Sequence, residues 1–169
     1  IGSVFTEYIL THEKISKKEA WNKGIAMLEK MRLPSADNIM ESYPFQLSGG
    51  MRQRVMIAIA FACDPKILIC DEPTTALDVT IQGQILDIIK ELQREHNTSV
   101  IMITHDLGVV ANIAQKIAVM YSGMIVERGN CEDIFYRPRH PYTWALIRSD
   151  LTLRISRYLH QFQEHRQIC

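Results

Sequence analysis

Apolar residues in the first part of the chain recur at the spacing of helices. Residues 4–10 form a short apolar stretch, and residues 16–19 (SKKE) have the Ser-x-x-Glu pattern of a helix capping box. The apolar residues within 20–31 then recur every three to four positions, and a second short helix is expected at 36–42. This part of the chain therefore predicts helices and no strands.

Beyond this region, short aliphatic runs alternate with amphipathic stretches. The runs at 67–70 and 99–104 have the length and continuous hydrophobicity of strands that are buried on both faces. Residues 80–96 place apolar side chains on one helical face and charges opposite. The strand–helix alternation across 66–121 predicts an α/β fold with a mainly parallel sheet flanked by helices.

The last third of the chain predicts a hairpin followed by helices. A strand at 116–121, a turn at Ser122-Gly123 and a second strand at 124–127 have the pattern of two strands joined by a tight turn. A helix capped by Asp106 is expected at 106–115, and further helices are expected around 134–135 and at 142–147.

Composition narrows the class of protein. The chain has 169 residues, 47% of them apolar, with 19 basic and 19 acidic residues that give zero formal net charge. This balance gives no electrostatic basis for binding nucleic acid, and no apolar run reaches the length of a membrane span. The four cysteines (Cys63, Cys70, Cys131 and Cys169) show no paired spacing, so they are interpreted as reduced residues, not disulfide partners or metal ligands.

The segment Ser48-Gly49-Gly50 precedes an apolar helical stretch. A hydroxyl and unhindered backbone N–H groups at the start of a helix suit a bound anion, and glycines allow a phosphate to approach the backbone closely. The alternative is an ordinary loop that caps a helix.

Two carboxylates and a histidine follow the predicted strands. Asp71 and Glu72 come directly after the run at 67–70, and His105 comes after the run at 99–104. Ligands of α/β sheets bind at the carboxyl ends of strands, so these three side chains are expected to face one site. Asp71 could hold Mg²⁺, Glu72 could polarise an attacking water, and a neutral His105 could donate to a phosphate oxygen. The alternatives are acids in a solvated loop and a surface histidine.

These motifs resemble those of the ATP-binding-cassette (ABC) ATPases. LSGGMRQ (47–53) is similar to their signature motif, ILICDE (67–72) to their Walker B strand, and TTALD (74–78) to their D-loop, while His105 resembles their switch histidine. Longer runs across 1–149 resemble the ATPase subunits of oligopeptide, dipeptide and nickel importers. The resemblance implies a partial P-loop NTPase fold with an amino-terminal helical subdomain.

The resemblance also implies domains and site residues. The expected parts are a helical subdomain (1–46), the carboxyl-terminal part of the ATPase core (47–149) and an atypical tail (150–169). The implied cofactors are ATP and Mg²⁺. The implied site comprises the catalytic Glu72 and His105, the metal ligand Asp71, and the nucleotide-binding Ser48, Gly49, Gly50, Gln53 and Asp78.

The implied partners are a second ABC ATPase subunit, two transmembrane permease subunits and, through them, an extracytoplasmic substrate-binding protein. No nucleic acid partner is expected. The implied function is to power uptake of peptide, or of nickel, from the cytoplasmic face of the cell membrane. Two alternatives stay open: a non-transport ABC ATPase, and a catalytically dead remnant.

The phosphate-binding Walker A motif is absent from this sequence. No G-x-x-x-x-G-K-[ST] occurs in it, and in the family that loop and the first strands precede the helical subdomain. The chain also does not begin with Met. We therefore expect a carboxyl-terminal fragment that has no significant ATPase activity by itself.

The tail after Ser149 is expected to lack a family counterpart. One back-translation of 159–169, read from its third base, gives TSIPGTPPNL, which looks like the family's proline-rich segment. We therefore hypothesise a frameshift shortly after Ser149, with residues 150–169 disordered or loosely helical. The alternative is a genuine, divergent carboxyl-terminal helix.

Overall fold

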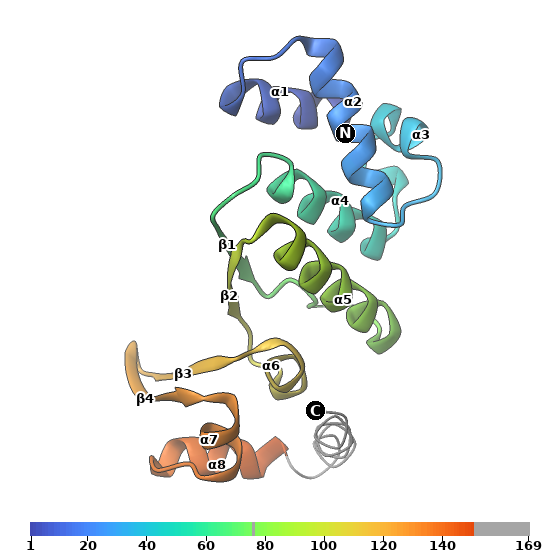
Figure 1. Cartoon of the computed structure of the whole chain (residues 1–169). Helices are drawn as coiled ribbons and strands as arrows, with labels where there is room; N and C mark the ends of the chain where they lie inside the picture. Colours follow the sequence, from blue (N-terminus) through green and yellow to red (C-terminus); the bar gives the residue numbers. More distant parts are fainter. Residues whose placement is uncertain (76, 151–169) are drawn as a thin grey trace, which may run out of the picture. The chain divides into compact units, whose positions relative to one another are not determined.

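The computed structural model describes residues 1–75 and 77–150 (Figure 1). The chain forms two compact units, Ile1–Ile103 and Thr104–Cys169. The first unit contains α1 (Gly2–His12), α2 (Lys17–Lys30), α3 (Ala36–Glu41), the 3-10 helix η1 (Pro44–Gln46), α4 (Gly49–Phe61), β1 (Ile67–Asp71), α5 (Val79–His96) and β2 (Ser99–Ile103).

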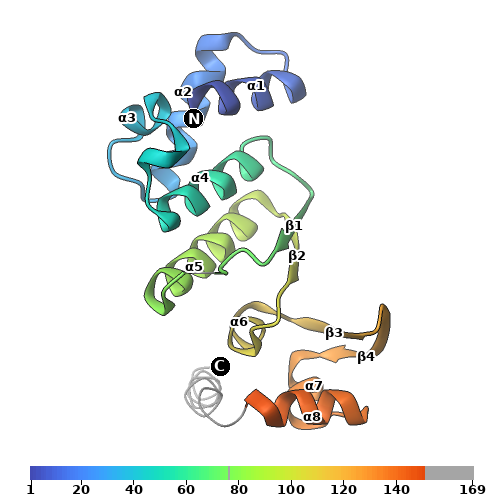
Figure 2. The same ribbon diagram turned by 180° about the vertical axis from the view of Figure 1, so that it is seen from behind.

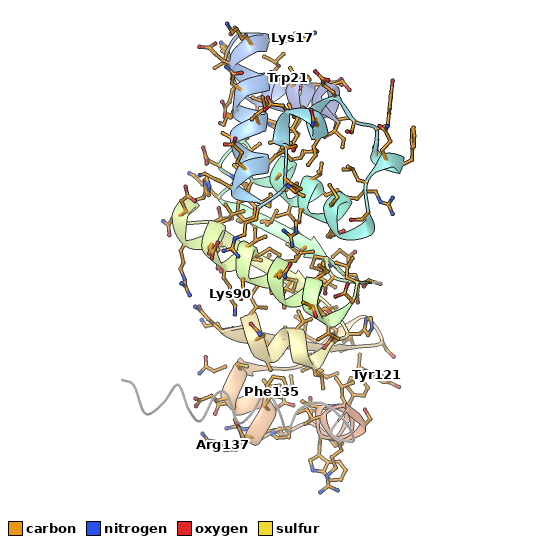
Figure 3. All side chains as sticks on the ribbon, turned by 90° about the vertical axis from the view of Figure 1, so that its right-hand side faces the viewer. Lys17, Trp21, Lys90, Tyr121, Phe135 and Arg137 are labelled. Atoms are coloured by element: carbon orange, nitrogen blue, oxygen red, sulfur yellow. The ribbon has the colours of Figure 1, made fainter. Side chains whose placement is uncertain are left out.

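The helices predicted at the amino terminus are confirmed, and the capping box begins α2. The Glu19 backbone N–H donates to the Ser16 hydroxyl (3.3 Å), and the Ser16 backbone N–H donates to the Glu19 carboxylate (2.8 Å). Hydrogen bonds from Ser16 hold the pKa of Glu19 below its usual value. Trp21 of α2 lies against α1, where a Cβ on Gly2 would overlap its ring (Figure 3).

The parallel sheet is present, and helices of the first unit cover one of its faces. β1 and β2 pair in parallel from Ile67 with Ser99 to Asp71 with Ile103. Helices α4 and α5 lie on one side of the two strands (Figures 1 and 2). Leu68 and Cys70 of β1 are buried. The other face carries Ile67, Ile69, Ile101 and Ile103, whose exposed fractions are 50–63%.

The prediction that both runs are buried on both faces is therefore wrong. Within the described residues this sheet has two strands, and in the first unit helices cover one side of it. Continuous hydrophobicity predicted the strands correctly. It carried no information on which elements would cover each face.

The second unit begins at Thr104 and contains α6 (Leu107–Ile113), β3 (Lys116–Tyr121), β4 (Met124–Asn130), α7 (Cys131–Tyr136) and α8 (Pro141–Asp150). The predicted hairpin is confirmed, because β3 and β4 are antiparallel. Ser122 (φ 49°) and Gly123 (φ 78°) make the turn, as in two-residue loops that need positive φ at both positions. Among the described strands β3 pairs with β4 alone, so the parallel sheet does not extend to it.

One carboxylate fastens the loop before α8. Glu127 of β4 accepts hydrogen bonds from the backbone N–H groups of Arg139 (2.8 Å) and His140 (3.0 Å). Burial raises the pKa of Glu127, but hydrogen bonds that include these two outweigh it and hold the pKa below its usual value. The carboxylate therefore stabilises the fold of this unit in its ionised form.

Cys63, Cys70 and Cys131 are free; Cys70 is buried, whereas Cys63 and Cys131 are half-buried. Burial raises the pKa of each of these thiols, which makes them poorer nucleophiles. In the part of the chain that the structure describes, no helix has the length and apolar character needed to cross a membrane. Residues 151–169, on which most of the predicted tail falls, lie outside the described residues.

Candidate nucleotide site

Ser48 begins α4 as its N-cap residue. Its backbone is extended (φ −63°, ψ 162°), and its hydroxyl accepts a hydrogen bond from the Met51 backbone N–H at 3.3 Å. The first N–H groups of a helix have no partner within it, and the aligned peptide dipoles favour an anion there. The first turn of this 13-residue helix contains no acidic residue, so nothing in that turn opposes a phosphate. Ser48 and Gly49 are exposed, while Gly50 and Gln53 are half-buried.

The two glycines allow the start of α4 to approach the start of α5. A Cβ on Gly50 would lie 2.9 Å from Cγ2 of Ile81, which is closer than real Cβ atoms come. A Cβ on Gly49 would lie 3.8 Å from Cδ2 of Leu77, an ordinary contact. The structure therefore brings the Ser48–Gln53 segment beside the residues around Asp78.

Asp78 is the N-cap residue of α5. Its Oδ1 accepts a hydrogen bond from the Ile81 backbone N–H at 2.9 Å. Gln82 of the same helix donates to the hydroxyl of the buried Thr74 at 3.2 Å, so the loop before the helix is fastened to its first turn. The Asp78 side chain is exposed, and a role in binding nucleotide stays a prediction.

Asp71 and Glu72 lie at the carboxyl end of β1, as predicted. Asp71 is the last residue of the strand and is exposed. Glu72 has φ 48°, a left-handed backbone that is uncommon for a residue other than glycine, and its N–H donates to the carbonyl of Ile103 at 2.9 Å. The Thr75 hydroxyl donates to the Glu72 carboxylate at 2.7 Å, which restricts where that carboxylate lies. Such unusual backbone conformations gather at functional sites.

His105 follows β2 by two residues and belongs to the second unit. It is exposed, and it directly precedes Asp106, the N-cap residue of α6. Asp106 accepts hydrogen bonds from the N–H groups of Gly108 (2.8 Å) and Val109 (3.2 Å), which confirms it as the predicted cap of α6. That His105 faces the same site as Asp71 and Glu72 stays a prediction.

The donor set fits Mg²⁺ held chiefly by a nucleotide. No group of three or more His, Cys, Asp or Glu side chains gathers as a metal site within residues 1–75 and 77–150. Mg²⁺ is usually bound by one or two carboxylates together with phosphate oxygens and waters. An exposed Asp71 at the end of a strand supplies one such oxygen ligand, so the residues present are compatible with Mg²⁺–ATP.

Sequence patterns missed two sets of contacts that shape this site. The Thr75–Glu72 hydrogen bond was not foreseen, although a threonine three residues after an acid is a recognisable signal. The hydrogen bonds of Arg54, which join α4 to α2 and α5, have no local signal because their partners lie 22 to 30 residues away.

Comparison with known proteins identifies the family. The profile described as "ABC transporter" matches residues 1–75, and that described as "Oligopeptide/dipeptide transporter, C-terminal region" matches residues 126–167. The chain belongs to the ABC transporter ATPase family. The second match runs past Ser149, so the expectation that the resemblance to this family stops there is wrong. It does not decide the reading frame of the tail, which stays a hypothesis.

Individual relatives agree with this assignment. The oligopeptide transport ATP-binding protein AmiE of Streptococcus pneumoniae is 60% identical over 149 residues, covering 88% of this chain and 42% of AmiE. OppD of Bacillus subtilis is 55% identical over 156 residues, covering 92% of this chain and 44% of OppD. The dimeric cassette MJ0796, solved with ADP and Pi, has a TM-score of 0.66 at 28% identity, covering 77% of this chain and 56% of MJ0796. The chain thus spans less than half the length of the curated relatives.

Proposed function

We propose that this chain is the carboxyl-terminal part of the ATP-hydrolysing subunit of an ABC importer that takes up oligopeptides or dipeptides. The observation that carries the proposal is the 60% identity to an oligopeptide transport ATP-binding protein across 88% of the chain. The local structure is compatible with it, because Ser48 begins α4 and Asp71 and Glu72 lie at the carboxyl end of β1, the kinds of position at which proteins bind phosphates and other ligands.

Each residue then has a distinct role. The Ser48–Gly50 turn presents a hydroxyl and backbone N–H groups to phosphate oxygens. Gln53 and Asp78 lie beside this turn and bind the nucleotide at its edges. Asp71 holds Mg²⁺, which, when bound, neutralises charge on the phosphates. Glu72 accepts a proton from the attacking water, while the Thr75 hydroxyl restricts the orientation of its carboxylate. His105 donates to the terminal phosphate.

The same proposal defines the partners. Two ATPase subunits close around ATP, with the Ser48–Gly50 turn of one subunit facing nucleotide held by the other. Their opening and closing drives two transmembrane permease subunits, which receive peptide from an extracytoplasmic binding protein. The ATPase subunit itself lies at the cytoplasmic face of the membrane as a peripheral component.

A hybrid protein tests this function. The 149 matched residues of AmiE are replaced by their counterparts from this chain, and ATP hydrolysis and oligopeptide uptake are measured in cells that lack AmiE. We expect both activities to return. Glu72→Gln in the hybrid should abolish hydrolysis but keep ATP binding, because an amide cannot accept the water's proton. A folded hybrid with no hydrolysis, or an active Glu72→Gln hybrid, would contradict the proposal.

The 169 residues contain no G-x-x-x-x-G-K-[ST] loop to bind the β- and γ-phosphates. Mg²⁺–ATP titrated into the purified chain therefore tests what its own residues bind. Negligible binding by the chain, together with an active hybrid, would mean that the chain's residues are competent but need a phosphate loop supplied from elsewhere.

A further inference from the structure

Arg54 joins three helices of the first unit. It lies on α4, two turns after Ser48, and is half-buried. Its Nη1 donates to the backbone carbonyls of Met31 (3.2 Å) and Arg32 (3.5 Å), and its Nη2 donates to Oε1 of Gln84 on α5 (2.6 Å). One guanidinium therefore ties the helix that begins at Ser48 both to the end of α2 and to α5.

The partners at the end of α2 explain why an arginine fits there. The last carbonyls of a helix have no partner within it and carry the negative end of the helix dipole. α2 ends at Lys30 with Met31 as its C-cap residue, and Arg32 has left-handed backbone (φ 56°), which turns the chain out of the helix. A planar guanidinium can donate to these carbonyls and to Gln84 together, whereas a lysine ammonium is a single point charge.

Two ion pairs also connect the end of α2 with α5, but unlike Arg54 they lie at the surface. Lys30 pairs with Glu95, and Arg32 pairs with Glu91 at 2.7 Å. All four side chains are exposed, and exposed ion pairs contribute little because water and salt screen them. The ion pairs of these side chains run to α5 and not to α4, although the backbone carbonyl of Arg32 accepts from Arg54. Removing a side chain of either pair therefore leaves the hydrogen bonds of Arg54 in place. The two pairs provide matched controls for charge and location.

The position of α4 matters because its start is packed closely. Gly50 has no room for a Cβ beside Ile81, so a small shift of α4 against α5 alters the contact between them. Ser48 and Asp78 stand at the two helix starts that meet there.

We propose that Arg54 is a positioning residue: it acts through α4 to hold the Ser48–Gly50 turn in register with the segment from Leu77 to Ile81. This inference rests on the proposed function, in which that turn closes over nucleotide. Arg54 does not contact nucleotide itself; it determines whether the turn is in place when ATP arrives.

Hydrogen exchange on the 169-residue chain tests the positioning. We expect Arg54→Lys and Arg54→Gln to speed hydrogen exchange of the Met51 and Ile81 amides about tenfold, beyond any increase that a change in global stability causes in all slowly exchanging amides. Lys30→Gln should leave the exchange rates of these two amides unchanged. Exchange that stays unchanged, or that rises equally throughout the first unit, would overturn the proposal. If Arg54→Gln does not fold, the milder Arg54→Lys carries the test.

The AmiE hybrid supplies a functional measurement. Loss of positioning weakens closure over ATP, so Arg54→Lys should raise the KM for ATP about tenfold and leave kcat within about twofold, whereas Lys30→Gln changes neither. Equal KM values for Arg54→Lys and Lys30→Gln would contradict the role of Arg54. An unmodified hybrid without activity would instead contradict the proposed function, and the exchange measurement would still decide the role of Arg54.

Discussion

Because Gly50 packs against Ile81, we predict that a Gly→Ala substitution has opposite effects on the free energy of unfolding at Gly50 and at Gly83. In a helix, alanine is favoured over glycine by up to about 1 kcal/mol. At Gly83 of α5 nothing lies within 4 Å of the added Cβ, so Gly83→Ala should stabilise the first unit by most of that amount. At Gly50 the new Cβ would lie 2.9 Å from Cγ2 of Ile81.

The cost at Gly50 can be estimated from this overlap. Ile81 is branched at Cβ and has few rotamers, so it cannot easily turn its methyl away. Overpacking of this kind costs about 1–3 kcal/mol, which exceeds the gain in helix propensity. Gly50→Ala should therefore destabilise the first unit by about 1 kcal/mol. In an Ile81→Ala background, which removes the clashing methyl, the same change should become neutral or stabilising.

Urea denaturation measures these free energies of unfolding. The chain has two tryptophans, so a Trp144→Phe background leaves Trp21 as the fluorescent probe of the first unit. The double-mutant cycle of Gly50→Ala with Ile81→Ala isolates their coupling energy, with Gly83→Ala as the matched control. If Gly50→Ala stabilises the chain as much as Gly83→Ala does, the close approach of α4 to α5 is not as the structure shows.

Three further outcomes are expected. Ser16→Ala removes the hydroxyl of the capping box and should lower the free energy of unfolding by about 1 kcal/mol, measured in urea. The pKa of Glu127 is lowered in the folded state, so its stabilisation is present above the unfolded-state value of about 4.3 and is lost as pH falls through the folded-state pKa. Glu127→Gln should destabilise the second unit by about 1 kcal/mol at pH 7, with a smaller difference from the parent chain in acid, measured by thermal unfolding from pH 3 to 7. The purified 169-residue chain should show no significant ATPase activity in a phosphate-release assay, and robust Mg²⁺-dependent turnover would contradict the expected need for a phosphate-binding loop.

Local signals in the sequence predicted the elements well. The capping box at Ser16, the cap at Asp106 and the turn at Ser122-Gly123 each depend on a few adjacent residues, and all three are confirmed. The placement of Ser48 at a helix start and of Asp71 at a strand end followed from the same kind of pattern. In each case the residues that determine the local structure are adjacent or nearly adjacent in the chain, so the sequence alone reveals the feature.

Features that depend on distant partners could not be predicted in this way. The hydrogen bonds of Arg54 and the close packing of Gly50 on Ile81 arise only when α2, α4 and α5 are placed in three dimensions. The left-handed backbone of Glu72 was also unforeseen, because a residue before proline is expected to be extended. The exposure of Ile67 also depends on distant parts of the chain, because the hydrophobicity of a strand does not indicate which elements cover its faces.

The exposed isoleucine face of the β1–β2 sheet has a consequence for how the isolated chain behaves in solution. Four isoleucines lie on it side by side, and among the described strands β1 and β2 pair only with each other, which leaves an unpaired edge on each. Exposed apolar faces and open strand edges promote association between chains. We expect the purified chain to scatter light increasingly with concentration, and a substitution of Ile69 by Lys on this face to suppress that scattering. On an isolated chain, such a surface would favour capture by chaperones or proteases, which bind exposed apolar segments.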